Sequence, residues 1–230
     1  LGAGVSAAAG FAKAEKQKKS DETVFAVVGD GEMQEGQVHE MALWAAHEKL
    51  DNFCVFVDWN RVQLTDALTE TMFINPTSFF TEKGWETIEV DGHNYDEIWA
   101  AINASSNGKP KAIVAKTIMG HGVVGMEEEG QKLKSTWHGK APKPELADEM
   151  LANLGEISGE EKTVLEAFRA DRKFMSIKNK FTEVGSRNES IEMGVPTLYD
   201  KNTVTDCRSA YGNALADLAK INPTILGSTA

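Results

Sequence analysis

The residues best suited to chemistry form two short groups, each at the end of an apolar run. Gly29-Asp30-Gly31 follows the apolar residues 24–28, and Asn60 follows the apolar residues 53–57. If both runs are neighbouring parallel strands, the carboxylate and the amide oxygen lie side by side at the sheet edge where α/β folds bind ligands. One carboxylate and one amide hold Mg²⁺ only when phosphate oxygens and a carbonyl complete the shell. Together the two groups indicate a magnesium diphosphate site.

The glycines beside Asp30 suit the approach of an anion. They let the backbone come close to a ligand and offer N–H groups to it. A helix that follows them would point its N-terminus at the same place, which favours phosphate. Taken alone, Gly-Asp-Gly is a common turn, so the prediction depends on the second group at Asn60.

The elements that must position these groups alternate between strand and helix. Apolar runs without alternation are typical of strands buried on both faces of a parallel sheet. They lie at residues 24–28, 53–57 and 112–115, with a more alternating run at 85–90. Helical patterns fill residues 5–18, 35–50 and 95–104. The order predicts an α/β fold with a doubly wound, mostly parallel sheet, helices on both faces and truncation at both ends.

The pattern changes near residue 143. Two charged helical stretches follow, at 145–154 and 158–173, and a helix with an apolar face spans 205–221. We predict a first domain at 1–150 that lacks its N-terminal part, a linker with helices at 151–203, and the start of a truncated second domain at 204–230. The acidic residues 127–129 are expected in a solvated loop.

Composition limits the class of protein. The chain has 230 residues, 41% hydrophobic and 26% charged, which is ordinary for a globular protein. A net charge of −11 argues against nucleic acid or an anionic membrane as the main partner, and no apolar run reaches the length of a membrane span. Cys54 and Cys207 are too few for a disulfide framework or zinc cluster, and fit the reducing cytoplasm.

The residues around these groups resemble the thiamine diphosphate-binding half of transketolases. The likeness runs in order along nearly the whole chain, and its strongest parts are the motifs at Asp30 and Asn60 and the run from Trp137 to Pro142. The remaining segments that carry it are residues 1–6, 50–53, 116–122 and 206–215. The chain departs from some relatives at Met119, where they carry a cofactor-contacting lysine, and at His39, where many carry an aromatic residue.

The resemblance implies a role for each site residue. Mg²⁺, or Ca²⁺ or Mn²⁺ in its place, would be held by Asp30, Asn60 and the Val62 carbonyl. Thiamine diphosphate would contact the same Asp30 and Asn60, with Leu1, Gly29, Gly31, Glu32 and His138. The catalytic residues would be His138, which would donate to or move a proton at the reacting oxygen, and Glu35 and Glu40, in a network between two active sites.

The implied activity is transfer of a two-carbon ketol unit from a ketose phosphate to an aldose phosphate, in a cytoplasmic homodimer. This chain alone is expected to be inactive. Alternatives are another thiamine diphosphate enzyme, of pyruvate dehydrogenase or deoxyxylulose phosphate synthase type, or a non-catalytic cofactor-binding subunit. A nicotinamide-binding fold would need a G-x-G-x-x-G turn after a strand, which residues 29–31 lack.

Overall fold

The structure is a computed structural model of the whole chain. It describes residues 2–155, 157–171, 191–200, 202–223 and 225. The chain divides into two compact units, residues 1–156 and 157–230. The predicted site residues all belong to the first unit.

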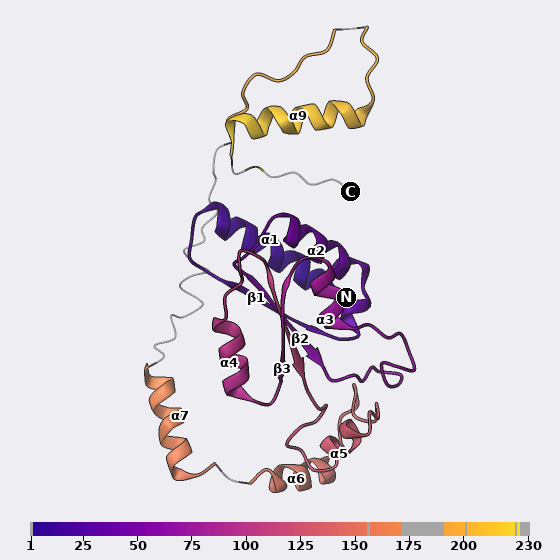
Figure 1. The fold of residues 1–230 in the computed structure, drawn as a ribbon, viewed down its shortest axis with the longest axis vertical. Helices are drawn as coiled ribbons and strands as arrows, with labels where there is room; N and C mark the ends of the chain where they lie inside the picture. The colour runs from indigo at the N-terminus through magenta and orange to yellow at the C-terminus, as the bar shows by residue number, and fades with distance from the viewer. Residues whose placement is uncertain (1, 156, 172–190, 201, 224, 226–230) are drawn as a thin grey trace. The chain divides into compact units, whose positions relative to one another are not determined.

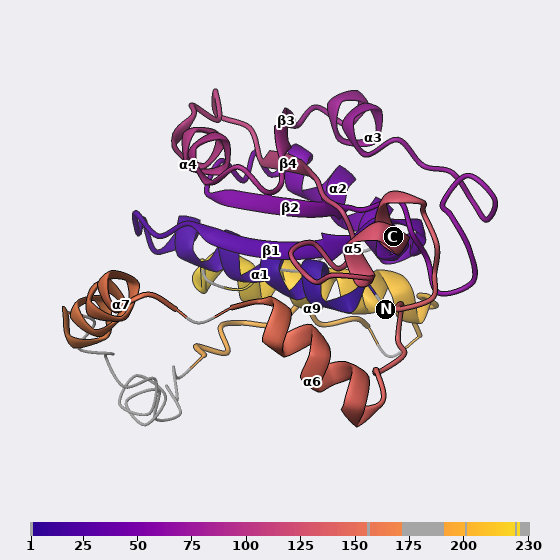
Figure 2. The ribbon, with the colours of Figure 1, turned by 90° about the horizontal axis from the view of Figure 1, so that it is seen from below.

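The first unit is built on a four-stranded parallel sheet. Its strands are β1 (Val24–Gly29), β2 (Phe53–Trp59), β3 (Glu86–Asp91) and β4 (Lys111–Lys116), in the order β1-β2-β4-β3 (Figure 2). Gly29 of β1 pairs with Asp58 of β2, so the carboxyl ends of these two strands are level. The parallel pairing and the four predicted strands are confirmed, and the groups after β1 and β2 do lie at one sheet edge. Burial on both faces, expected for residues 24–28, is wrong: β1 ends the strand order, and its Phe25 and Val27 are exposed.

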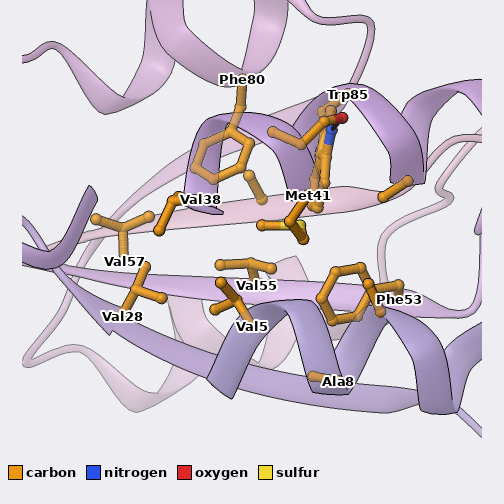
Figure 3. Packing of buried hydrophobic residues seen from close by; sticks show 14 of the residues in the cluster. Val5, Ala8, Val28, Val38, Met41, Phe53, Val55, Val57, Phe80 and Trp85 are labelled. Carbon is orange, nitrogen blue, oxygen red and sulfur yellow. Dashed lines mark hydrogen bonds between the residues drawn. The ribbon is translucent and has the colours of Figure 1, made fainter. Parts of the chain in front are cut away.

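Three helices cover one face of the sheet: α1 (Ala3–Gln17), α2 (Gly36–His47) and α3 (Pro76–Glu82). Their apolar sides share one core cluster with the inward residues of β1, β2 and β4. Figure 3 shows Val55 of β2 between Val5 of α1 and Met41 of α2. All three side chains are at most 3% exposed, so this layer fixes the strand ends that carry the site.

The opposite face is covered by α4 (Tyr95–Asn103), which packs on β3 and β4 (Figure 1). Ala101 of α4 joins Ile113 and Val90 in a second core cluster. Buried Lys111 donates from Nζ to three carbonyls at the end of this helix, those of Ala101, Ile102 and Ala104, at 3.0, 2.8 and 2.6 Å. Helices therefore lie on both faces, as the sequence predicts.

Two helices were not predicted. In α3, Pro76 stands in the first turn and the Asn75 Oδ1 accepts the Ser78 N–H at 3.0 Å, so a local cap starts a helix too short for a clear apolar period. Residues 127–129 lie in the first turn of α5 (Met126–Gln131), and the expectation of a loop there is wrong. Carboxylates in a first turn are stabilised by the N-terminal helix dipole. A short 3₁₀ turn, η1 (Glu32–Gln34), precedes α2.

The charged region after residue 143 is helical, as expected. The first unit ends with α6 (Pro144–Asn153), and the second contains α7 (Gly159–Asp171) and α9 (Cys207–Ile221). Asp206 caps α9 by accepting the Ser209 N–H at 2.9 Å. Residues 172–190 of the predicted linker lie outside the described residues, and the domain limits stay a prediction. Within the described residues, none of the helices is both long and apolar enough to cross a membrane.

Candidate functional site

Asp30 is the first residue after β1, and its side chain is turned inward at the strand end. The residue is 3% exposed, its Oδ2 accepts the Arg61 N–H at 2.6 Å, and its own N–H donates to the Asp58 carbonyl at 3.3 Å. Burial raises the pKa of Asp30, and the backbone N–H groups of Arg61 and Gly31 act against that rise. A nearby cation would offset the cost of keeping this carboxylate ionised in a buried place.

Asn60 is fixed by contacts on both sides of its amide. Its Nδ2 donates to Oδ2 of Asp58 at 3.2 Å, and its Oδ1 accepts the Val62 N–H at 2.9 Å. The hydroxyl of Thr117, after β4, donates to the other oxygen of Asp58. An amide oxygen has two lone pairs, so the Asn60 Oδ1 keeps one for a metal.

The chain after Asn60 forms a small hairpin, residues 61–68, which we call the site hairpin. Val62 and Ala67 form an antiparallel bridge, the Gln63 N–H donates to the Asp66 carbonyl and the Leu68 N–H donates to the Arg61 carbonyl, both at 2.9 Å. Arg61 has φ 64°, a left-handed conformation that costs energy in a residue with a side chain. The turn at Arg61 brings its N–H to Asp30.

Gln63 has a buried polar atom without a hydrogen-bond partner in the described part of the chain. Its Nε2 is buried and has no hydrogen-bond partner among the described residues. A Cβ built on Gly31 would lie 3.3 Å from this nitrogen, so the amide stands directly over the glycine. A buried N–H without an acceptor is costly, which is why such groups in native proteins usually serve a bound molecule or water.

His138 belongs to the same place. It is exposed, and its N–H donates to the Ser135 carbonyl at 2.9 Å in the turn of residues 135–139. Its charge is among those that lower the pKa of Asp30, so the ring lies within electrostatic reach of the carboxylate. The structure thus brings together Asp30, Gly31, Asn60, Val62 and His138.

The other predicted residues are placed differently. Glu32 accepts the Gly2 N–H on Oε1 at 3.0 Å, which ties the start of α1 to the site turn. Glu35 is the residue before α2, and Glu40 lies exposed on that helix. Gly29 is the last residue of β1, and Leu1 lies outside the described residues. The expected network role of Glu35 and Glu40 stays a prediction.

Three contributors were missed from the sequence: Asp58, Thr117 and Gln63. Asp58 precedes Asn60 by two positions at the end of β2, and that spacing was the available signal. Thr117 is 59 positions away from its partner Asp58, and only the register of β2 with β4 brings them together. Gln63 depends on the turn at Arg61, which no local pattern shows.

The donors at the site are hard oxygens. Among residues 2–155 and the other described segments, no group of three or more His, Cys, Asp or Glu side chains is placed to hold a metal. A metal at Asp30 would therefore combine one carboxylate with amide and carbonyl oxygens and would take further oxygens from its ligand. Such a shell fits Mg²⁺ or Ca²⁺ and not Zn²⁺.

Comparison with known proteins identifies a matching family. The transketolase thiamine diphosphate binding domain is the family model that matches, over residues 1–163. Transketolase from Mus musculus is 31% identical over 229 residues, 98% of this chain and 34% of that protein. A 6-deoxy-6-sulfo-D-fructose transketolase subunit from a Clostridium species is 39% identical over 128 residues, 53% of this chain and 46% of that protein.

A solved structure leads to the same family. Transketolase from Campylobacter jejuni superposes with a TM-score of 0.59 at 25% identity, over 96% of this chain and 38% of that one. The chain thus spans about a third of the length of the full transketolases that it resembles. Because the family model covers well over half of its residues, the chain belongs to the family of transketolase thiamine diphosphate binding domains.

Proposed function

We propose that this chain is the diphosphate-binding part of a transketolase, which moves a two-carbon ketol unit from a ketose phosphate to an aldose phosphate. The observation that carries the proposal is the buried carboxylate of Asp30, which accepts the N–H of the residue after Asn60, with the unpartnered Nε2 of Gln63 over the neighbouring Gly31. Thiamine diphosphate would supply the carbon chemistry when bound.

The residues present fit a magnesium diphosphate. Asp30, the Asn60 amide and the Val62 carbonyl would hold the metal, and the free N–H of Gln63 would donate to a diphosphate oxygen over Gly31. The side chain of any other residue at position 31 would meet Gln63, so the glycine keeps that space open. The metal would offset the charge of the Asp30 carboxylate, and a diphosphate oxygen would accept the unpartnered N–H of Gln63.

His138 would act on the substrate. His138 is exposed, and its ring could donate to an oxygen that gains negative charge, or move a proton at that oxygen. The remaining parts of a complete active site, including the pyrimidine-binding domain, would come from further sequence on the same or another polypeptide.

We also propose a cytoplasmic homodimer in which each cofactor lies between this domain and the pyrimidine domain of the other subunit. Glu35 and Glu40 would then join the two sites. Two free cysteines, Cys54 and Cys207, are in keeping with a reducing compartment.

Calorimetric titration of the chain with thiamine diphosphate tests the binding step. We expect binding that requires Mg²⁺ and that Asp30→Asn weakens at least about 100-fold, because a charged metal ligand is lost. Asp51→Asn is the matched control, since Asp51 is an exposed carboxylate before β2, at the opposite end of that strand. Equal binding by wild type and Asp30→Asn would refute the assignment of the site.

A second assay separates the possible activities. The chain joined or mixed with a pyrimidine-binding domain should convert xylulose 5-phosphate and ribose 5-phosphate to sedoheptulose 7-phosphate. Binding without this turnover would point to another thiamine diphosphate enzyme if pyruvate is consumed, and to a non-catalytic subunit if no donor is. Because one relative is named for 6-deoxy-6-sulfo-D-fructose, that sugar belongs among the donors tested.

A further inference from the structure

Two loops from different strands meet at a second point beside the site. The tip of the site hairpin, Leu64 and Thr65, lies against the turn of residues 135–139. Ser135 Oγ donates to the Thr65 carbonyl at 3.3 Å, and a Cβ built on Gly139 would lie 3.3 Å from Cδ1 of Leu64. These two contacts are called the latch.

The latch holds the turn on both sides of His138. Ser135 stands three residues before the histidine and also accepts its N–H at 2.9 Å. Gly139 follows it directly, with φ 80°, where a side chain would be strained as well as crowded by Leu64. The backbone on both sides of the histidine is therefore in contact with the tip of the hairpin.

Backbone hydrogen bonds join the base of the site hairpin to its tip. The bridge between Val62 and Ala67 and the Gln63–Asp66 hydrogen bond make it one stiff unit. Its base donates to Asp30 through the Arg61 N–H and to the Asn60 Oδ1 through the Val62 N–H. A molecule that fixes the base will fix the tip, because the two ends are joined by backbone hydrogen bonds.

We propose that Leu64 and Ser135 are positioning residues, which couple the metal and diphosphate end of the site to His138. The site hairpin and the turn of residues 135–139 would then move as one unit. Binding of metal and diphosphate at the base of the hairpin would hold the turn in place. The catalytic meaning of this coupling rests on the proposed function, whereas the mechanical coupling itself does not.

The test uses Ser135→Ala and Leu64→Ala. Leu64 is 69% exposed, so its truncation leaves the core intact. Ser135→Thr keeps the hydroxyl and serves as the rescue. Thr136→Val is the matched control, because the neighbouring hydroxyl donates to Glu129 Oε2 at 2.8 Å and not to the hairpin.

Amide hydrogen exchange of residues 135–140 is the first readout. Both latch variants should speed exchange there about five- to tenfold, as expected for loss of one hydrogen bond or contact, and leave β1 and β2 unchanged. Ser135→Thr should restore the wild-type rate. Unchanged exchange in both latch variants, or an equal rise in Thr136→Val, would overturn the latch.

Cofactor and turnover give the second readout. Thiamine diphosphate with Mg²⁺ should slow exchange of residues 135–140 in the wild type, and this protection should be lost in Ser135→Ala while the affinity for the cofactor stays within about threefold. In the assembled enzyme, kcat of Ser135→Ala should fall while its KM for the cofactor stays unchanged.

Two outcomes separate the proposals. If no variant, including the wild type, binds the cofactor, the proposed function fails, but the exchange rates still decide whether the latch exists. Cofactor binding without protection of residues 135–140 would refute the coupling.

Discussion

The backbone N–H of Arg61 donates to Oδ2 of Asp30 at 2.6 Å, so the loop after β2 closes on the carboxylate after β1. Arg61 reaches this position through a left-handed φ of 64°. The strained residue lies between the two side chains, Asp30 and Asn60, that we expect to hold the metal. Strain at such a point is typical of a site shaped for a ligand and not for stability.

Gln63→Met is expected to change stability and cofactor binding in opposite directions. Without cofactor, loss of a buried N–H that lacks a partner should leave the free energy of unfolding unchanged or raise it by about 1 kcal/mol. With Mg²⁺, the affinity for thiamine diphosphate should fall about 10- to 100-fold, because a hydrogen bond to a charged oxygen is lost. Urea unfolding and calorimetry measure the two effects.

The control for this prediction is Gln131→Met, an exposed glutamine whose side chain donates to Glu127 in α5. It should change neither quantity measurably. A fall in stability of Gln63→Met without cofactor would show that the amide has a structural partner and would remove the argument from the orphan donor.

The two cysteines should differ sharply in reactivity. Cys54 is 4% exposed, and burial raises its pKa to about 11, whereas Cys207 is exposed. Only a thiolate reacts with an aromatic disulfide reagent, so at about pH 8 Cys54 should react more than about 100-fold more slowly than Cys207. Absorbance should show one fast thiol in the wild type and none in Cys207→Ser, with Cys54 released by denaturant. Two fast thiols in the folded chain would contradict the buried placement of β2.

The sequence predicted that Asp30 and Asn60 share one sheet edge, because both follow the ends of strands. Asp30 and Asn60 each end an apolar run, and parallel pairing alone was enough to place them together. The contacts of Thr117 with Asp58 depend on strand register, and the position of Gln63 depends on one left-handed residue. Neither leaves a periodic pattern in the sequence, so sequence reasoning could not find them.

The strands of the fold were predictable from the sequence, whereas two short helices were not. Continuous apolar runs predicted β1, β2 and β4, and a more alternating run predicted β3. Burial on both faces holds for β2 and β4 but not for β1, where Phe25 and Val27 are exposed, so an apolar run alone does not separate a central strand from this edge strand. The helix α3 was missed because its identity rests on a local cap at Asn75 and only two well-buried phenylalanines, Phe79 and Phe80. Residues 127–129 looked solvated because they are charged, yet negative charge at the start of a helix favours the helix.

His39→Phe should reduce the sensitivity of the fold to mild acid. The ring centroids of His39 and Phe79 lie 4.6 Å apart with the ring planes nearly perpendicular, and Lys83 Nζ lies 3.6 Å from the centroid of the same phenylalanine. Burial, and then the charge of Lys83, lower the pKa of His39. A lowered pKa means that the neutral ring stabilises the fold: this contribution is complete above about pH 6.5 and is lost as the pH falls through the folded-state pKa.

Urea unfolding at about pH 7.5 and about pH 5.5 measures this effect. The free energy of unfolding should fall by less in His39→Phe than in the wild type. His47→Phe replaces the other histidine of the same helix and should behave as the wild type does. Equal losses in all three proteins would assign the acid sensitivity to other groups.

Lys111→Met should loosen α4 from the sheet. Lys111 is 6% exposed, and its ammonium group is the donor to the carbonyls of Ala101, Ile102 and Ala104. Methionine fills the same stem volume but leaves these acceptors without that donor and removes a cation from the negative end of the helix. Loss of a buried charge offsets part of the cost, so we expect the free energy of unfolding to fall by roughly 1–3 kcal/mol.

The control is Lys109→Met, at an exposed lysine two residues earlier, which should have no such effect. In Lys111→Met, amide hydrogen exchange should rise in α4 alone. If Lys111→Met proved as stable as Lys109→Met, water would satisfy the helix end and the lysine would not be needed as its cap.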